Sequence, residues 1–247
     1  MEVLGVIPAR YGSSRFAGKV LADILGKPMI QWVYEAASKV KLLDGLIIAC
    51  DDERILRAVK NFGAKAVLTS KDHACGTDRI AEVVNPIDTK IVVNIQADEP
   101  CLHPAMVDSV ARALLDNKNV VMSTLRKEIS NIEELYDPNI VKVVVDRDDF
   151  ALYFSRSAIP SPIREIDRSN PVLPKGFFKH IGLYAYTKDF LFTFKNLPAS
   201  PLERIERLEQ LRVLENGYKI KVVETDFETI GVDTPEDLTK VKNKLSS

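Results

Sequence analysis

The sequence has few cysteines, little net charge and no long apolar run, and each shortage argues against a class of protein. Cys50, Cys75 and Cys101 are odd in number and lack C-x-x-C spacing, which argues against a disulfide framework or a zinc site and favours a reducing cytoplasm. A net charge of −1 over 247 residues gives no general attraction to nucleic acid or to a membrane. Only a short apolar run follows Met1-Glu2, so we expect neither a signal peptide nor a membrane span.

Two common phosphate-binding motifs are also missing. The spacing from Gly12 to Gly18 is one residue too long for G-x-x-x-x-G-K-[ST], and Val20 stands where that motif has its magnesium-binding hydroxyl. No G-x-G-x-x-G follows the first apolar run. These absences disfavour Walker-type ATPases and dinucleotide-binding dehydrogenases.

A different cationic loop follows the first predicted strand. Residues 3–7 form a short apolar run that Pro8 ends, and Arg10, Arg15 and Lys19 then lie among small residues. Small residues let backbone N–H groups approach an anion closely. The loop therefore suits a nucleoside triphosphate, although three cations in ten residues could also form an ordinary solvated face.

The periodicity of the remaining chain predicts an α/β fold in one domain. Strands and helices alternate, which is typical of a parallel sheet covered by helices. We expect strands at residues 3–7, 46–50, 66–69, 90–95 and 120–125, and helices at residues 30–40, 53–63, 77–84 and 104–114.

The pattern changes after residue 140. Residues 141–145 and 150–154 predict an antiparallel hairpin, and the polar run 161–175 predicts a loop. Residues 180–186 predict a strand with His180, Tyr184 and Tyr186 on one face, which is either a binding wall or an ordinary core or dimer surface. Residues 201–214 predict one amphipathic helix whose inward positions are Leu202, Ile205, Leu208 and Leu211. Residues 219–224 predict a further strand.

Acidic residues follow the strand at residues 90–95. Ligands of open parallel sheets bind at the carboxyl ends of the strands, and Asp98 and Glu99 lie there. We expect Asp98 to hold a hard cation such as Mg²⁺ and Glu99 to have a structural role, because neighbours on an extended chain point to opposite faces. The alternative is a turn in which Asp98 caps the helix that begins at Pro104.

Two predicted helix starts carry further candidate site residues. Thr77 would cap the helix at 77–84 and leave N–H groups and Arg79 near the pocket, unless Arg79 is a surface residue. Thr234, Pro235 and Asp237 form a near-complete helix start. Asp233 lies just outside it and is either a second metal carboxylate or a loop acid.

Several motifs together resemble one family, the 3-deoxy-manno-octulosonate (Kdo) cytidylyltransferases, also called CMP-Kdo synthetases. The resemblance runs nearly from end to end. Its motifs are Pro8-Ala9-Arg10-x-x-Ser13-x-Arg15-x-x-x-Lys19-x-Leu21, Cys75-Gly76-Thr77-Asp78-Arg79, Gln96-Ala97-Asp98-Glu99-Pro100, Tyr153-Phe154-Ser155-Arg156, His180-Ile181-Gly182-Leu183-Tyr184, Leu208-Glu209-Gln210-Leu211-Arg212 and Val232-Asp233-Thr234-Pro235-Glu236-Asp237. Ala97 stands where the family usually has Gly, and Cys75 where it usually has Ser.

The resemblance implies a fold and a reaction. The fold is a Rossmann-like three-layer sandwich of the nucleotide-diphospho-sugar transferase type, with a mostly parallel mixed sheet and a smaller antiparallel insertion for the sugar and for dimerisation. The reaction is transfer of CMP from CTP to the anomeric hydroxyl of Kdo for lipopolysaccharide synthesis, with Mg²⁺, in a cytoplasmic homodimer. Residues 1–126 would bind mainly CTP, residues 140–218 the sugar and a second subunit, and residues 219–247 would close the domain.

The same resemblance implies the site residues. Lys19, Asp98, Asp233 and Arg10 would be catalytic, and Asp98 and Asp233 would hold the metal. The nucleotide would contact Pro8, Ala9, Arg10, Ser13, Arg15, Lys19, Cys75, Gly76, Thr77, Arg79, Gln96 and Ala97. The sugar would contact Gln96, Arg156, His180, Tyr184, Glu209 and Gln210, with Arg156 the natural partner of its carboxylate.

Three alternatives stay open at this point. The acid sugar could instead be 8-amino-Kdo or a sialic acid, or the chain could be a nucleotide-binding homologue that has lost catalysis. The chain offers no convincing general base, since His180 fits a sugar-hydroxyl contact better, so we expect the metal to lower the pKa of the attacking hydroxyl.

Overall fold

Strand β1 (Val3–Ala9) lies inside a nine-stranded sheet in the computed structural model of this chain, which describes residues 1–12, 16–73, 75–161 and 175–246. The other strands are β2 (Asp23–Ile24), β3 (Lys27–Pro28), β4 (Gly45–Cys50), β5 (Ala66–Leu68), β6 (Ile91–Asn94), β7 (Met122–Glu128), β8 (Lys142–Val145), β9 (Ala151–Ser155), β10 (Phe178–Thr187) and β11 (Lys221–Glu224). The helices are α1 (Met29–Ala37), α2 (Glu53–Asn61), α3 (Gly76–Val84), α4 (Pro104–Leu115), α5 (Ile132–Tyr136), α6 (Lys188–Asn196), α7 (Pro201–Glu206), α8 (Gln210–Glu215) and α9 (Pro235–Ser246).

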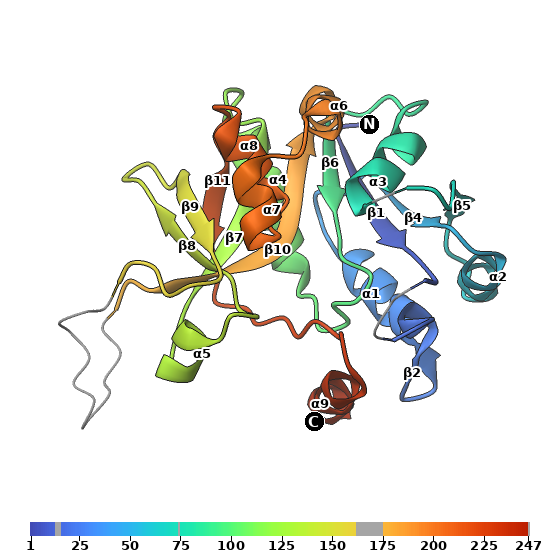
Figure 1. Cartoon of the computed structure of the whole chain (residues 1–247). Helices are drawn as coiled ribbons and strands as arrows, with labels where there is room; N and C mark the ends of the chain where they lie inside the picture. The colour runs from blue at the N-terminus through green and yellow to red at the C-terminus, as the bar shows by residue number, and fades with distance from the viewer. Residues whose placement is uncertain (13–15, 74, 162–174, 247) are drawn as a thin grey trace.

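The main sheet is mostly parallel, as the alternation of strands and helices predicts. Its order is β11-β7-β10-β6-β1-β4-β5, and β1 pairs in parallel with both β4 and β6. β10 runs antiparallel to its neighbours β6 and β7 (Figure 1). The hairpin of β8 and β9 joins this sheet through β10, so the predicted antiparallel addition is confirmed. A second, two-stranded sheet consists of β2 and β3.

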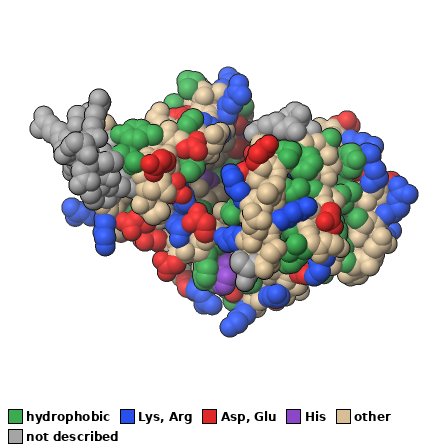
Figure 2. All heavy atoms as spheres, turned by 90° about the horizontal axis from the view of Figure 1, so that it is seen from below, with side chains coloured by type: hydrophobic (Ala, Val, Ile, Leu, Met, Phe, Trp, Pro, Cys, Tyr) green, Lys and Arg blue, Asp and Glu red, His purple; other side chains and the backbone are tan. Residues whose placement is uncertain are grey.

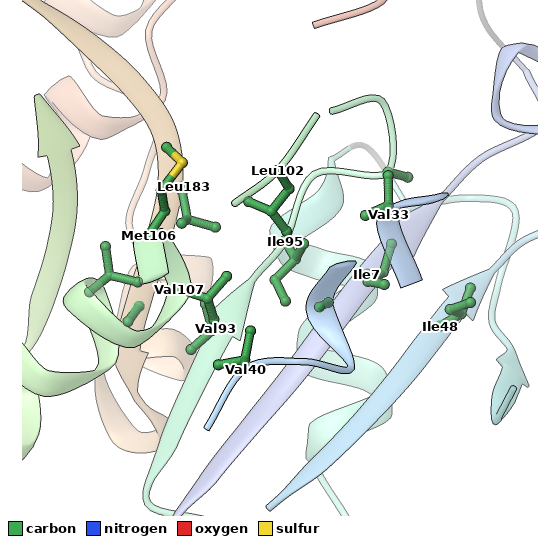
Figure 3. Close-up of a cluster of buried hydrophobic side chains, with 14 of the residues drawn as sticks. Ile7, Val33, Val40, Ile48, Val93, Ile95, Leu102, Met106, Val107 and Leu183 are labelled. Carbon is green, nitrogen blue, oxygen red and sulfur yellow. The ribbon is translucent and has the colours of Figure 1, made fainter. Parts of the chain in front are cut away.

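Helices cover both faces of the sheet and give three layers. On one face, α1, α2 and α4 supply apolar side chains to a continuous core. Figure 3 shows part of that core, where Val33 of α1 and Met106 and Val107 of α4 lie against residues of β1, β6 and β10. Every side chain in this cluster is less than a tenth exposed, so its burial is a main source of stability.

The opposite face is covered by α3, α6 and α8. Ile80 of α3, Phe194 of α6 and Leu211 of α8 are at most 1% exposed. Alternate residues of β10 serve the two faces: Leu183 and Ala185 belong to the first core, whereas Tyr184 and Tyr186 lie against the second. The predicted alternation along this strand is therefore confirmed.

The last helix returns to the amino-terminal half. Val232 and Val241 pack with Ile24 and Met29 in a separate apolar cluster, all four being fully buried. In Figure 1, α9 lies below the main sheet, on the side of α1 and β2. The start of α9 has the predicted cap, because the Thr234 hydroxyl accepts a bond from the Asp237 N–H at 3.2 Å and the Asp237 carboxylate accepts one from the Thr234 N–H at 3.2 Å.

The prediction of one helix over residues 201–214 is wrong. Arg207 adopts a left-handed backbone conformation (φ 55°, ψ 47°) and separates α7 from α8. Leu208 and Leu211 point inward as expected, but Ile205 is 77% exposed because the break turns its face of α7 away from the core. The predicted loop at 161–175 lies almost entirely outside the described residues. Within the described residues, none of the helices combines the length and apolarity that a membrane span requires.

Candidate active site

A pocket of about 310 Å³ opens at the carboxyl ends of β1 and β6. Three separate segments line it: the end of β1 with the loop that follows, the residues before and within the first turns of α3, and the chain after β6. The lining residues are Pro8, Arg10, Lys19, Val20, His73, Cys75, Gly76, Arg79, Gln96, Ala97 and Asp98. Figure 2 shows the face of the molecule below the sheet, where acidic and basic side chains are interspersed and do not separate into two regions. Nine of the lining residues belong to the nucleotide and metal sets expected from the sequence.

Lys19 connects the two aspartates that the sequence singles out. Its Nζ lies 2.6 Å from Oδ2 of Asp98 and 2.9 Å from Oδ1 of Asp233, and it also donates to the carbonyl of Val232 at 2.9 Å. The backbone N–H of Val232 donates to the Asp98 carbonyl at 2.9 Å, which ties the two segments together directly. The expected convergence of these residues is therefore confirmed, although 214 positions separate Lys19 from Asp233.

The electrostatics of this cluster keep Lys19 charged. Burial acts to lower the pKa of its ammonium, but the charges and hydrogen bonds of Asp98 and Asp233 outweigh burial and raise it. The Asp98 and Asp233 side chains remain 32% and 55% exposed, so a ligand can reach both carboxylates. The alternative in which Asp98 caps α4 is wrong, because His103 is the capping residue and accepts from the Ala105 N–H.

This pair of carboxylates fits a hard divalent cation. Two carboxylates that share one ammonium are close enough to share another cation. Mg²⁺ typically takes one or two carboxylates and fills its remaining positions with water and substrate phosphates. Among the described residues, no group of three or more His, Cys, Asp and Glu side chains is placed to hold a metal. Water and substrate phosphates would therefore supply the rest of the coordination.

Glu99 lies beside Asp98 but in a different environment. Burial, reinforced by the negative charge of Asp98, raises the pKa of the Glu99 carboxyl to about 8, and a hydrogen bond with Thr229 works in the opposite direction. Glu99 is absent from the pocket lining. Its position agrees with the expected structural role.

The start of α3 differs from the prediction. Cys75, not Thr77, occupies the N-cap position of α3, and its side chain makes no cap hydrogen bond there. Thr77 lies inside the first turn, and its hydroxyl donates to Oε2 of Glu209 at 3.2 Å. The Cys75 thiol also bonds the Glu209 carboxylate, and burial followed by the Glu209 charge raises the pKa of Cys75 to about 12. Thr77 therefore links the nucleotide pocket to α8, and its side chain does not line the pocket.

Arg79 lines the pocket but is not a surface residue. It is 4% exposed, and its guanidinium donates to the Thr69 hydroxyl, to the Ser70 carbonyl at 3.1 Å and to Asp51 Oδ2 at 3.3 Å. The other Asp51 oxygen accepts from the Tyr11 N–H at 2.9 Å. Arg79 and Asp51 together therefore hold the beginning of the loop that follows β1.

Other members of the nucleotide set are placed differently. Arg10 is exposed at the pocket, whereas the Ala9 side chain is fully buried in the core and leaves only its backbone for a ligand. Ala97 lacks a positive φ, so the methyl group does not introduce the backbone strain that replacement of a left-handed glycine would cause. Ser13 and Arg15 lie outside the described residues.

Two candidate sugar residues lie along β10. Gln96 lines the pocket and donates to the Gly182 carbonyl at 3.2 Å. The rings of His180 and Tyr184 are 5.5 Å apart, and Tyr184 stacks against Tyr186 at 6.0 Å. The aromatic wall predicted from the alternation of β10 therefore exists, and Gln96 connects it to the nucleotide pocket.

The environment of His180 makes it a weak base. Burial lowers the pKa of its imidazole to about 3. Nε2 lies 2.8 Å from the Thr124 hydroxyl, which can give its single proton to the carbonyl of Leu183 at 2.9 Å. The hydroxyl then accepts from Nε2–H, and Nδ1 is left as the acceptor nitrogen.

The remaining sugar candidates meet at the break between α7 and α8. Glu209 is at the start of α8, bonded to Thr77, and Gln210 follows it at 4% exposure. The Arg156 backbone N–H donates to Oε2 of Glu206 at 2.9 Å, and its Nε donates to the Glu206 carbonyl at 2.8 Å. Arg156 does not line the pocket, but this path through α7 and α8 connects it to the start of α3.

Sequence reasoning misses three residues of this region. His73 lines the pocket and bonds the Glu82 carboxylate, whose pKa it lowers. Asp51 and Glu206 are held through contacts with residues far away in the sequence. His73 precedes the Cys75 motif and could have been suspected from that position, whereas Asp51 and Glu206 have no local signal.

Comparison with known proteins agrees with the geometry. A family model described as cytidylyltransferase matches residues 4–220. The 3-deoxy-manno-octulosonate cytidylyltransferase of Syntrophotalea carbinolica is 53% identical over 247 residues, and that of Geotalea uraniireducens is 50% identical over 252 residues, each match covering 99% of both chains.

Solved structures give the same relationship. A CMP:2-keto-3-deoxy-manno-octonic acid synthetase complexed with CTP superposes with a TM-score of 0.92 at 43% identity, covering 100% of this chain and 99% of the other. A 4-diphosphocytidyl-2C-methyl-D-erythritol synthase from Anaerococcus prevotii, with a TM-score of 0.65 at 13% identity over 100% and 99% of the two chains, shares the fold. The chain belongs to the 3-deoxy-manno-octulosonate cytidylyltransferase family.

Proposed function

We propose that this protein transfers CMP from CTP to the anomeric hydroxyl of Kdo, giving CMP-Kdo and pyrophosphate for lipopolysaccharide synthesis. The observation that carries the proposal is that Lys19, which lines the pocket together with Asp98, contacts the carboxylates of both Asp98 and Asp233. Family membership over the full chain supports the same reaction.

Nucleotide binding would use the positive side chains at the pocket. Arg10 and Lys19 would hold the triphosphate, with Arg15 of the same loop as a further partner. Backbone groups around Pro8, Ala9, Cys75 and Gly76 would surround the nucleotide, together with Ser13, Ala97, Thr77 and Arg79. Arg79 would act mainly by holding the loop through Asp51, since three of its five guanidinium donors are used in contacts with the protein.

The sugar would bind between Gln96, the β10 wall and the start of α8. Tyr184 and the Nδ1 atom of His180 would contact sugar hydroxyls, as would the polar ends of Glu209 and Gln210. Arg156 would bind the sugar carboxylate, because a guanidinium matches a carboxylate in two bonds. The sugar oxygen would then attack the α-phosphorus as the bond to pyrophosphate breaks, and holding the two substrates in line accounts for much of the rate.

Asp98 and Asp233 would hold Mg²⁺. The ion supplies positive charge to the phosphates and lowers the pKa of the attacking hydroxyl. Lys19 would release these carboxylates and turn to the triphosphate. His180 would not act as the base, because the pKa of its imidazole is only about 3.

The proposal extends to the compartment, the oligomeric state and the roles of three parts of the chain. We place the protein in the cytoplasm as a homodimer, with residues 1–126 mainly for CTP, residues 140–218 for the sugar and the second subunit, and residues 219–247 closing the domain. The near-neutral charge gives no reason to expect nucleic acid as a partner.

A pyrophosphate-release assay tests the proposal. The protein is supplied with Mg²⁺, each of the four nucleoside triphosphates, and Kdo, 8-amino-Kdo or a sialic acid. We expect release with CTP and Kdo, at a kcat/KM well above every other pair. Equal release with another acid sugar would change the substrate, and no release with any pair would overturn the enzymatic function.

A further inference from the structure

Lys142 is the most unusual buried charge outside the pocket. It lies at the start of β8 with 0% exposure, although lysine is rarely fully buried without a charged partner. All three of its described hydrogen bonds go to backbone carbonyls: Asp137 at 2.8 Å, Ile140 at 2.6 Å and Arg156 at 2.7 Å. Burial lowers the pKa of the Lys142 ammonium, so its placement carries an electrostatic cost.

The three carbonyls belong to two segments that meet at Arg156. Asp137 and Ile140 lie in the turn between α5 and β8, and Pro138 of that same turn accepts from Nη1 of Arg156 at 2.9 Å. Lys142 therefore reaches Arg156 in two ways: it binds the Arg156 carbonyl, and it fixes the turn that holds the Arg156 guanidinium.

Glu206 holds Arg156 from the other side. Its carboxylate accepts from the Ser155 hydroxyl at 2.7 Å and from the Arg156 N–H at 2.9 Å, while its carbonyl accepts from Nε. The Arg156 backbone is thus fixed at both its N–H and its carbonyl. Two donors of the guanidinium, Nε and Nη1, are used by protein carbonyls, and no described hydrogen bond uses Nη2.

We propose that Lys142 and Glu206 are positioning residues that set the orientation of Arg156 toward the carboxylate of the acid sugar. The proposal rests on the proposed function, in which Arg156 binds that carboxylate. Donors that are held in place before the ligand arrives bind it with less loss of side-chain freedom. An apolar side chain at position 142 would fill the same space but leave the Arg156 carbonyl and the turn without their shared donor.

The test measures the two Michaelis constants separately. Lys142→Met keeps most of the length of the unbranched side chain and removes its donors, so we expect the KM for Kdo to rise about tenfold while the KM for CTP stays within about twofold. Arg156→Ala should raise the KM for Kdo at least as much. The double variant should match Arg156→Ala alone, because Lys142 acts through Arg156.

Lys179 offers a matched control. It is also a buried lysine, 8% exposed, and it pairs with Lys142 across β8 and β10, but its partners are Glu134 and Glu228. Lys179→Met should lower the unfolding temperature and leave the KM for Kdo within about twofold. If Lys142→Met does not fold, Glu206→Gln carries the test, because its amide nitrogen cannot accept and the KM for Kdo should rise severalfold.

The outcomes separate this inference from the proposed function. A wild-type protein without pyrophosphate release from CTP and Kdo would remove the proposed function before any variant is compared. An active wild type in which Lys142→Met and Glu206→Gln leave the KM for Kdo unchanged would overturn only the positioning role. The positioning role would also be overturned if the increases in the KM for Kdo caused by Lys142→Met and Arg156→Ala multiply in the double variant. Independent effects would mean that Lys142 does not act through Arg156.

Discussion

Asp98 is the residue whose substitution separates metal-assisted chemistry from nucleotide binding. Asp98→Asn keeps the size of the side chain but removes the charge that faces Lys19 at 2.6 Å. We expect turnover to fall about 100-fold or more, while the affinity for CTP changes by less than about fivefold, because the proposed triphosphate contacts of Arg10 and Lys19 would remain. Steady-state pyrophosphate release and CTP titration measure the two effects. Unchanged turnover would contradict the metal role.

His180 gives a pH-dependent prediction at the same scale. The pKa of its buried imidazole is about 3, against roughly 6.5 in an unfolded chain. Between these values the unfolded state binds a proton that the folded state does not, so stability falls as the pH falls below about 6.5 and is unaffected by this group at higher pH. From pH 7 to pH 5 the loss due to His180 is about 2 kcal/mol.

Urea unfolding at the two pH values checks this expectation. The wild type should lose about 2 kcal/mol more than His180→Gln between pH 7 and pH 5. Equal losses in the two proteins would show that His180 titrates normally. The imidazole resonances should also show no titration between pH 5 and pH 8 in the folded protein.

At the scale of elements, the break between α7 and α8 is the feature that determines where Glu206 and Glu209 lie. Arg207 is exposed and left-handed there, and a side chain costs roughly 1–2 kcal/mol in that conformation. Arg207→Gly should raise the free energy of unfolding by about 0.5–1 kcal/mol, since glycine adopts this conformation readily but gains freedom in the unfolded chain. Arg207→Val is the matched control and should lower it. Denaturant unfolding of both variants measures the difference, and stabilisation by Val would refute the explanation.

The same break shows where sequence reasoning about elements fails. Apolar positions from Leu202 to Leu211 recur at helical spacing, and an arginine gives no local sign of a left-handed residue. The alternation along β10 was predictable because successive side chains of that strand face the two cores on opposite sides of the sheet. The misplaced cap at α3 has a similar origin: threonine is a common capping residue, but here Thr77 bonds Glu209 in another element.

At the scale of the whole molecule, the site joins α9 to the sheet. The cluster of Ile24, Met29, Val232 and Val241 holds this helix, and Lys19 binds both sides of the junction. We expect Mg²⁺ and CTP together to slow hydrogen exchange across α9, because a ligand between Asp98 and Asp233 adds a further link. Helix α6, which lies above the sheet in Figure 1 whereas α9 lies below it, should not change. Equal slowing in Asp98→Asn would contradict this coupling.

The overall architecture was predictable to a greater degree than the internal contacts. The order of strands and helices indicates a parallel sheet, and the carboxyl ends of its strands indicate the site. The meeting of Lys19 with Asp98 and Asp233 could be anticipated, because each of these three residues lies near the carboxyl end of a predicted strand or the start of a predicted helix. The contact of Arg79 with Asp51 could not, since it depends on how α3 packs against β4.

The position of Lys19 determines how the charge around Asp98 and Asp233 would change when a divalent ion binds there. An ammonium between two carboxylates is an internal counterion: it leaves one negative charge where there would otherwise be two that repel each other. A divalent ion at the same place must exchange with this counterion, and the exchange takes the carboxylate pair from one net negative charge to none. The carboxylate pair would then no longer repel a polyanion, and the displaced lysine would add its own attraction.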